Sequence, residues 1–268
     1  MLVVIKGAGD LATGIAVRLR RARFQLVMTE ISIPTTIRRT VSFSQILTEG
    51  TGVATVEGIE AILASSVDGA KAILAEGRIA VLVDPDAACV AELRPDVVVD
   101  AILAKKNLGT KITDAPVVIA VGPGFTVGID CHAVIETQRG HDLGRVILYG
   151  GAAPDTGVPG EIGGEAEKRV LRAPCAGAFR QALEIGARVV PGAVVGRVGD
   201  MSVVSELDGI LRGVLADGVP VVLGMKCGDV DPRAVSWHCQ TISDKARAVG
   251  GGVLEAILQL YPGQITLG

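Results

Sequence analysis

Residues 1–30 read MLVVIKGAGDLATGIAVRLRRARFQLVMTE, and this stretch decides the fold that we expect for the first part of the chain. It opens on an apolar, β-branched run that predicts a strand, and the glycine-rich turn GAGDLATG follows over 7–14. From Leu11 onward the apolar residues recur at helical spacing. A second apolar run over 25–29 predicts another strand, which ends at Glu30. The order strand, glycine turn, helix, strand, acid is that of a dinucleotide-binding βαβ unit.

The residues of this turn each have a predicted role toward a bound pyrophosphate. Gly7 lets the chain leave the strand in a tight turn, and Gly9 has no Cβ that would block the phosphates. Backbone N–H groups at the start of the helix, at Asp10 and Leu11, would face the phosphates with support from the helix dipole. Gly14 would let the helix lie close to the sheet. The alternative is an empty Rossmann-like fold in which the glycines serve only packing.

Charged residues beyond the turn extend the predicted site. Glu30 stands where an acid accepts hydrogen bonds from a ribose diol, and its charge favours NAD(H) over NADP if the ligand is a nicotinamide nucleotide. Arg38 follows the second strand and could hold a phosphate or a carboxylate, although a solvated helix start explains it equally well. Lys105 and Lys106 follow a later predicted strand and suit an anionic ligand, with an ordinary charged loop as the alternative.

The composition argues against several classes of protein. The chain has 268 residues, enough for two modest domains, and a formal net charge of −3. It contains no basic tract, which argues against nucleic acid as a partner, and no apolar run long enough to span a membrane. Lys6 interrupts the first apolar run, so we expect no signal peptide. The 5 cysteines form no C-x-x-C pair, which indicates free thiols and a cytoplasmic location.

Residues 52–121 alternate in the manner of repeated βα units. Near-continuous Val, Ile and Ala in the apolar runs argue for a parallel sheet covered on both faces. We therefore expect an α/β fold that begins with a Rossmann-like nucleotide-binding domain over 1–125. The predicted strands are 53–56, 79–83, 97–102 and 116–121, and the predicted helices are 67–75 and 87–93.

The segment 126–168 is rich in Gly and Pro in its second half and is expected to connect two domains. Strand-like runs at 133–136 and 145–149 flank a polar stretch. Its Cys131-His132 pair and His141 match no structural zinc spacing, so we predict no metal site.

An internal repeat follows, because residues 173–200 align with residues 205–232 at an offset of 32. Two such halves joined by a hairpin predict a duplicated β module over 169–235. This pattern resembles the barrel-sandwich hybrid of biotinyl and lipoyl carrier domains. Those domains carry a modified lysine at the central hairpin, whereas the hairpin here, 199–203, has none. We therefore expect that this module is a rigid domain that binds a partner or covers the pocket, and that it is not a carrier domain.

The last predicted segment, 236–268, contains apolar residues at helical spacing over 241–260. We expect a helix that packs back on the N-terminal domain. Its three glycines, 250–252, each cost about 1 kcal/mol relative to alanine. They indicate either a break in the helix or a close approach to another backbone.

Eight motifs spread over nearly the whole chain are more specific than the glycine turn alone. They are GAGDLATG (7–14), TEISIPTTIRRTVSFSQ (29–45), AILAKKN (101–107), GPGFTVG (122–128), VIETQRGHDLGR (134–145), RVLRAPCAG (169–177), GDVDPR (228–233) and GGGVLEAIL (250–258). With these motifs the sequence resembles the YqeB-like family of accessory proteins for selenium-dependent molybdenum hydroxylases. The resemblance implies a bacterial protein that helps to mature or supply such hydroxylases. Its implied partners are the hydroxylase or other maturation proteins, and a homo-oligomer is left open. A dinucleotide form of the molybdenum cofactor would suit the glycine turn, with its pterin end toward Arg38 and the two lysines.

Three functional hypotheses remain open, and whether the protein is an enzyme remains open with them. The first is the accessory protein, with a nucleotide-bearing ligand in its N-terminal pocket. The second is an NAD-dependent oxidoreductase of a small carboxylate, for which the sequence lacks a Tyr-x-x-x-Lys motif at Tyr149 or Tyr261. The third is a non-catalytic scaffold that binds the hydroxylase through the β module.

Overall fold

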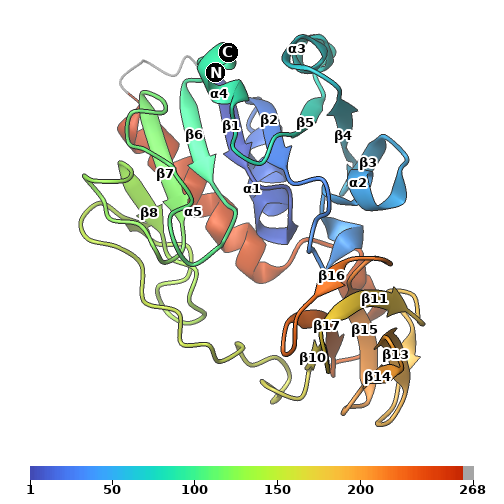
Figure 1. The fold of residues 1–268 in the computed structure, drawn as a ribbon. Coiled ribbons are helices and arrows are strands. Elements are labelled where there is room, and N and C mark those ends of the chain that lie inside the picture. Colours follow the sequence, from blue (N-terminus) through green and yellow to red (C-terminus); the bar gives the residue numbers. More distant parts are fainter. Residues whose placement is uncertain (262–268) are drawn as a thin grey trace.

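The computed structural model describes residues 1–261 and contains one nine-stranded sheet and two four-stranded sheets (Figure 1). The strand order of the large sheet is β3-β4-β5-β2-β1-β6-β7-β8-β9. From β4 to β8 neighbouring strands run parallel, whereas β3 and β9 run antiparallel at the two edges. The strands are β1 (Leu2–Lys6), β2 (Gln25–Glu30), β3 (Val53–Val56), β4 (Ile59–Ala64), β5 (Ile79–Val83), β6 (Val97–Asp100), β7 (Val117–Val121), β8 (Ala133–Ile135) and β9 (Val146–Ile147).

Helices cover both faces of the large sheet. Side chains alternate along a strand, so Val3 and Ile5 of β1 pack on the α1 and α5 side, while Val4 packs on the α3 and α4 side. Acidic Asp10 in the first turn of α1 and basic residues in its last turn suit the helix dipole. The helices are α1 (Asp10–Arg21), α2 (Gln45–Glu49), α3 (Val67–Ala75), α4 (Cys89–Leu93) and α5 (Asp244–Leu260), with 3₁₀ turns η1 (Arg39–Val41) and η2 (Ser236–Cys239).

Close backbone contacts explain the glycines of α5, which runs unbroken from Asp244 to Leu260. A Cβ on Gly250 would lie 3.0 Å from the carbonyl oxygen of Gly14, and one on Gly252 would overlap the carbonyl oxygen of Gly144. A Cβ on Gly14 would lie 2.6 Å from the Cβ of Ala246. Gly14 therefore lets α1 approach α5, and its predicted role in packing against the sheet is wrong.

The internal repeat forms the β module, which comprises strands β10 to β17 over residues 170–231. At the offset of 32, β10 to β13 correspond to β14 to β17. The sheets have the orders β10-β17-β15-β12 and β14-β13-β11-β16, so each contains strands from both halves. The strands are β10 (Val170–Arg172), β11 (Gly177–Gln181), β12 (Arg188–Val189), β13 (Val194–Val198), β14 (Met201–Val204), β15 (Gly209–Val214), β16 (Pro220–Val221) and β17 (Lys226–Asp231).

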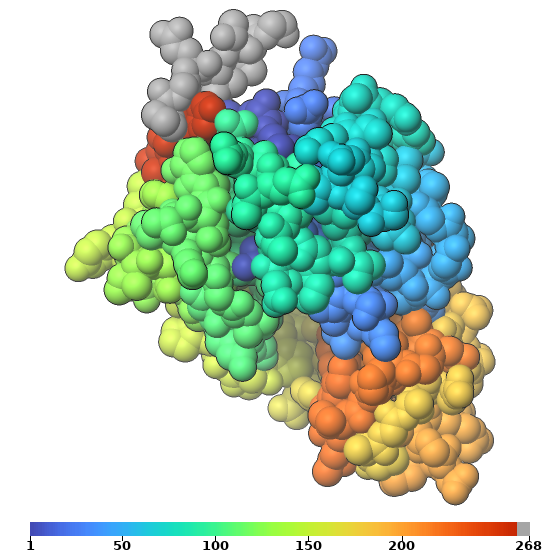
Figure 2. Space-filling model, turned by 45° about the horizontal axis from the view of Figure 1, so that its top comes forward, coloured from blue at the N-terminus to red at the C-terminus, as the bar shows by residue number. Residues whose placement is uncertain are grey.

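The segment after β2 attaches the β module to the large sheet. The N–H of Val214 in β15 donates to the carbonyl oxygen of Ile37 over 2.8 Å. Arg39 donates through Nε to the carbonyl oxygen of Val214 over 3.0 Å and through a terminal nitrogen to Gln181 over 2.8 Å. Figure 2 shows the module, in yellow to orange, as a lobe joined to the main body on one side.

The predicted fold class is wrong for the sheet and for the β module. In place of a Rossmann-like parallel sheet, the structure has a large mixed sheet whose edge strands β3 and β9 are antiparallel. β3 and β4 are joined through Glu57 and Gly58, which both have positive φ, and a two-residue turn of this kind joins antiparallel strands. In place of a biotinyl/lipoyl-like barrel-sandwich hybrid, the described residues form two separate antiparallel sheets.

Within residues 1–261, no helix has the length and apolar character needed to cross a membrane. The predicted terminal segment, 236–268, includes residues 262–268, which lie outside the described part of the chain. The helix predicted within this segment is confirmed as α5, which begins three residues later than expected and contacts α1.

Two adjacent glycines of α5 provide a matched test of its packing. Gly252→Ala should lower the free energy of unfolding by about 1–3 kcal/mol, because the new methyl group overlaps the carbonyl oxygen of Gly144. Gly251→Ala should raise it by about 0.5–1 kcal/mol, because nothing lies within 4 Å of its Cβ position and alanine favours a helix. Urea unfolding of both variants measures the difference. Equal effects would contradict the assigned contact.

Candidate functional site

A cleft of about 880 Å³ lies between the carboxyl ends of the central strands and the β module. Ligands of open parallel sheets bind at this end of the strands. The arrowheads of β6 and β7 in Figure 1 point toward this side of the molecule. The cleft is lined by seven of the predicted site residues, namely Gly7, Gly9, Asp10, Leu11, Glu30, Arg38 and Lys105, and the other two, Gly14 and Lys106, do not line it.

The start of α1 presents unpaired backbone donors to the cleft. Gly9 precedes the helix in an extended conformation, and no side chain caps it. Within the described residues, the N–H groups of Gly9, Asp10, Leu11 and Ala12 have no hydrogen-bond acceptor, and all four residues line the cleft. Unpaired N–H groups at a helix N-terminus bind phosphates and other anions. This end of α1 can therefore hold an anionic ligand.

Gly7 and Gly9 have different roles in the turn. Gly7 has a φ of +100°, and a Cβ there would lie 3.0 Å from the carbonyl oxygen of Ala101. The fold itself therefore requires glycine at this position. Gly9 has an ordinary φ of −72°, and its Cβ position is 3.3 Å from the side-chain oxygen of Thr36. The backbone at Gly9 tolerates a side chain, and it is the space in front of the helix that this glycine keeps open.

Glu30 organises the turn from the end of β2. Its carboxylate accepts hydrogen bonds from the N–H groups of Ala8 and Ile31, each over 2.9 Å. Burial raises the pKa of Glu30, and the two backbone hydrogen bonds oppose that effect. Because a carboxylate has about four acceptor sites, Glu30 can still accept from a ribose hydroxyl while it holds Ala8.

Arg38 and Asp10 form a buried ion pair at the mouth of the turn. Arg38 donates to Asp10 over 2.9 Å and to the carbonyl oxygens of His238 and Thr241 over 2.9 and 3.1 Å. Its side chain is 6% exposed. Nε of Arg38 and Oδ1 of Asp10 are buried and have no hydrogen-bond partner within the described residues. Arg38 thus ties the turn to η2, and its buried Nε is left without a hydrogen-bond partner among the described residues.

Lys105 and Lys106, which the sequence groups together, separate in the structure. Lys105 lines the cleft and forms an ion pair with Asp155 across 2.7 Å, which lowers the pKa of Asp155. Both partners are exposed, so the pair contributes little to stability. The backbone of Lys106 packs under Gly124, whose Cβ would lie 2.6 Å from the Cα of Lys106. The chain around Lys106 therefore shapes the loop, and Lys105 alone reaches the cleft.

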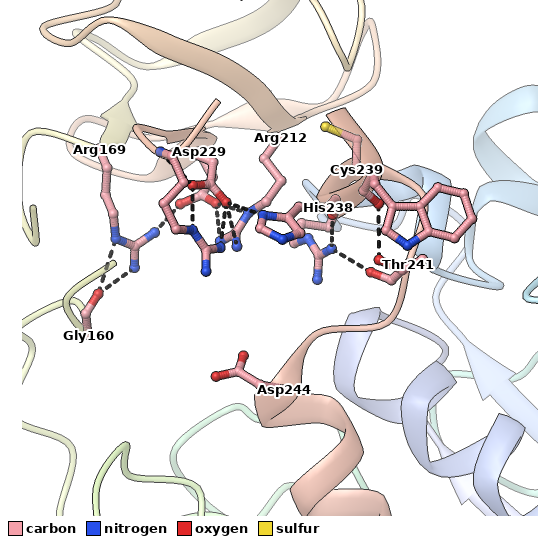
Figure 3. A network of polar contacts seen from close by, with 12 residues as sticks. Gly160, Arg169, Arg212, Asp229, His238, Cys239, Thr241 and Asp244 are labelled. Atoms are coloured by element: carbon pink, nitrogen blue, oxygen red, sulfur yellow. Dashed lines mark hydrogen bonds and ion pairs between the residues drawn. The ribbon is translucent and has the colours of Figure 1, made fainter. Parts of the chain in front are cut away.

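A group of cationic side chains, here called the cationic wall, lines the cleft from the β module. It consists of Arg169 beside β10, Arg172 in β10, Arg212 in β15 and Lys226 in β17, which are neighbouring strands of one sheet. Arg169 and Arg212 both donate to Asp229, which is 1% exposed (Figure 3). Arg169 also donates to the carbonyl oxygen of Gly160 over 2.8 Å.

A second buried carboxylate extends this network away from the cleft. Asp231 accepts from Arg212 over 3.5 Å and from Arg233 over 2.7 Å. Burial by itself would raise the pKa of Asp231, but the Arg233 hydrogen bonds and the charge of Arg212 lower it to about 2. Buried ion pairs of this kind are costly to break on one side, because the remaining charge is left without a partner. The network therefore holds the guanidinium groups of Arg169 and Arg212 in place.

The cationic wall has no counterpart in the predicted site. Arg169 and Arg172 lie in the motif RVLRAPCAG, whereas Arg212 and Lys226 stand apart on β15 and β17, and no spacing rule connects the four residues. The only signal in the sequence was that RVLRAPCAG belongs to the family resemblance. Their convergence depends on the pairing of β10, β17 and β15.

The described residues offer little else for chemistry. Among them, no group of three or more His, Cys, Asp and Glu side chains could hold a metal ion. Burial raises the pKa of the Cys89 and Cys131 thiols to about 12 and that of Cys227 to about 11. Such thiols are protonated near neutral pH and are poor nucleophiles. Neither Tyr149 nor Tyr261 lines the cleft.

The chain has a close relative among curated proteins. The uncharacterized protein YqeB of Escherichia coli (strain K12) is 52% identical over 259 residues, which are 97% of this chain. The chain is YqeB-like. The match covers 48% of YqeB, so the chain spans about half the length of that relative. No family model matches the chain.

Solved structures resemble the chain only weakly. A succinylglutamate desuccinylase/aspartoacylase from Rhodobacter sphaeroides is 14% identical and covers 85% of this chain and 84% of its own, with a TM-score of 0.26. An aspartoacylase family protein from Mesorhizobium loti is 12% identical with the same coverage and a TM-score of 0.28. The ectoine utilization protein EutE (DoeB) from Ruegeria pomeroyi is 18% identical, covers 31% and 27%, and has a TM-score of 0.23. At these scores the likeness supports no conclusion about activity.

The lowered pKa of Asp231 predicts a pH-dependent contribution to stability. Because the pKa is about 2 in the folded state and 3.8 otherwise, the carboxylate stabilises the fold above pH 4, and this stabilisation is lost as the pH falls toward 2. Asp231→Asn should lower the free energy of unfolding by about 2 kcal/mol at pH 7 and by much less at pH 2. Urea unfolding at both pH values measures the effect.

The matched control is Asp68→Asn, because the side chain of Asp68 is 87% exposed on α3. Its effect should be within about 0.5 kcal/mol at either pH. A loss of stability in Asp231→Asn that is equally large at pH 2 and pH 7 would contradict the assigned role of the carboxylate.

Proposed function

We propose that this chain is an accessory protein for the maturation or cofactor supply of a selenium-dependent molybdenum hydroxylase, and that its cleft binds a nucleotide-bearing ligand. The observation that supports ligand binding is the open N-terminus of α1, whose unpaired N–H groups line a cleft of about 880 Å³. A cleft of this size suits a nucleotide or dinucleotide. The hydroxylase is proposed from the motif resemblance.

The residues around the turn suit a pyrophosphate joined to a ribose. The N–H groups of Gly9 to Ala12 would hold the phosphates, and Glu30 would accept from the ribose hydroxyls. NAD(H) and a dinucleotide form of the molybdenum cofactor share this unit. Arg38 would add its positive charge at the cleft wall, and Lys105 offers an exposed ammonium group toward the rest of such a ligand.

Substitution of Gly9 tests the site while the fold stays intact. ADP, which contains the shared unit, should bind the wild-type protein in isothermal titration calorimetry. Gly9→Asp should abolish this binding, because it places a bulky negative charge in front of the helix, and it should leave the melting temperature nearly unchanged, because φ at Gly9 is −72°. ADP binding that persists unchanged in Gly9→Asp would overturn the assignment.

Two control variants separate binding from folding. Gly7→Ala should lower the melting temperature, because of the positive φ and the nearby Ala101 carbonyl group. Gly251→Ala, on α5, should bind ADP as the wild type does. The cellular role is tested in a host that lacks the protein: wild type should restore the hydroxylase activity, and Gly9→Asp should not. Full restoration by Gly9→Asp would show that the ligand site is not needed for that role.

A further inference from the structure

The cationic wall carries more positive charge than its carboxylates neutralise. The wall and Arg233 together supply five cationic side chains, of which Arg169, Arg212, Lys226 and Arg233 form ion pairs with only two carboxylates, Asp229 and Asp231. Asp229 already accepts from Arg169 and Arg212 through both of its oxygens. The excess faces the cleft, because four of the five cations line it. The formal net charge of the whole chain is −3, so this concentration of positive charge is local.

Two members of the wall are free to meet a ligand. Nζ of Lys226 is 3.8 Å from the nearest Asp229 oxygen, which is too far for a hydrogen bond, and that oxygen is held by Arg169. Among the described residues, Arg172 donates only to the carbonyl oxygen of Gly224, over 3.0 Å. The side chain of Lys226 is 41% exposed, so a ligand in the cleft can reach it.

Lys245, at the start of α5, extends the positive surface toward the glycine turn. It lines the cleft, and no carboxylate of the described residues lies within ion-pair distance of it. Burial lowers the pKa of Lys245, and Arg139 lowers it further. Burial likewise lowers the pKa of Lys226, with Arg169 and Arg212 adding to the effect. Lys245 is half-buried without an ion-pair partner among the described residues, and the partly exposed Lys226 has only the shared Asp229 at 3.8 Å, so a bound anion would stabilise both ammonium groups.

Asp10 connects this positive surface to the start of α1. Asp10, in the first turn of α1, lines the same cleft as Lys226 and Lys245, so the two lysines and the helix start that would hold the pyrophosphate face one cavity. The negative charge of Asp10 partly opposes the effect of burial on the pKa of both lysines. One oxygen of Asp10 is buried without a partner, and Nε of Arg38 is left over in the same way, with the Arg38 side chain 6% exposed. The polar groups at this end of the cleft are thus incompletely satisfied by the protein.

We propose that Lys226 and Lys245, supported by Arg172, form a second anion subsite that binds a phosphate-type dianion next to the pyrophosphate. Two ammonium groups and a guanidinium match the charge and the several oxygens of a phosphate better than those of a single carboxylate. This inference rests on the proposed function, because it gives the ligand a second anionic group beyond its pyrophosphate. It is a binding role only, and no bond is formed or broken.

Phosphorus NMR provides the test, because it resolves ADP and inorganic phosphate in one sample. Inorganic phosphate should bind the ADP-saturated wild-type protein without displacing ADP. In Lys226→Gln/Lys245→Gln, phosphate affinity should fall about tenfold or more, since two charge-assisted contacts are lost, while ADP affinity changes much less. The charge-matched control Lys71→Gln/Lys111→Gln removes two lysines outside the cleft and should leave phosphate affinity unchanged.

Failure of this inference is distinguishable from failure of the proposed function. Gly9→Val fills the space at the turn without adding charge, so it should lose ADP binding and keep phosphate binding. Phosphate that displaces ADP one for one, or that binds the double variant as well as the wild type, would overturn the second subsite. If the double variant does not fold, Lys226→Gln alone provides the same test, because Lys226 is partly exposed and donates no hydrogen bond to any described residue. If the wild-type protein binds phosphate but no ADP, and the lysine substitutions weaken that phosphate binding, the subsite stands and the proposed nucleotide site falls.

Discussion

The bend of the chain at Gly7 is the constraint on which the site depends. β1 lies between β2 and β6, and the chain leaves it with a φ of +100° against the backbone of Ala101. No side chain fits there, so the direction in which α1 begins is determined by this contact. The bend brings the unpaired N–H groups of α1 to the carboxyl ends of the strands, where Glu30 from β2 holds the turn through Ala8. Every other part of the cleft is arranged around this helix start.

On the opposite side of the cleft, hydrogen bonds and ion pairs of arginine side chains hold the β module in place. Arg39 and the backbone of Ile37 attach β15 to the segment after β2, and Arg38 bonds the carbonyl oxygens of His238 and Thr241. Asp229 then orients two guanidinium groups toward the ligand side. Burying charge costs free energy, so such a network gives little net stability and much positional order. An electropositive cleft on a chain of net charge −3 also attracts anions selectively to one place.

Local patterns predicted individual elements well. Three predicted elements are confirmed with the expected bounds, namely the strands at 53–56 and 79–83 and the helix at 67–75. In each of them the apolar residues follow a single periodicity, and residues that favour turns flank the segment. β4 was missed, since its sequence IEAILA shows no plain alternation of apolar and polar residues, although it lies inside the sheet between β3 and β5. The fold class failed for a related reason. Whether a strand joins a sheet as a parallel or an antiparallel neighbour depends on its connection and partner, and the apolar run itself is the same in both cases.

The sequence by itself determined the glycine turn, the acid at Glu30 and the helical register of α1, because these depend on residues close together in the chain and on backbone sterics. It also determined the repeat at an offset of 32, which is visible as identical spacing of glycines. Only the tertiary structure decided that Lys226 and Lys245 line the same cleft as the helix start, that Lys106 does not line it, and that Gly14 faces Ala246. These outcomes depend on contacts between distant segments, and such contacts follow from the packing of whole sheets and helices, which no local spacing encodes.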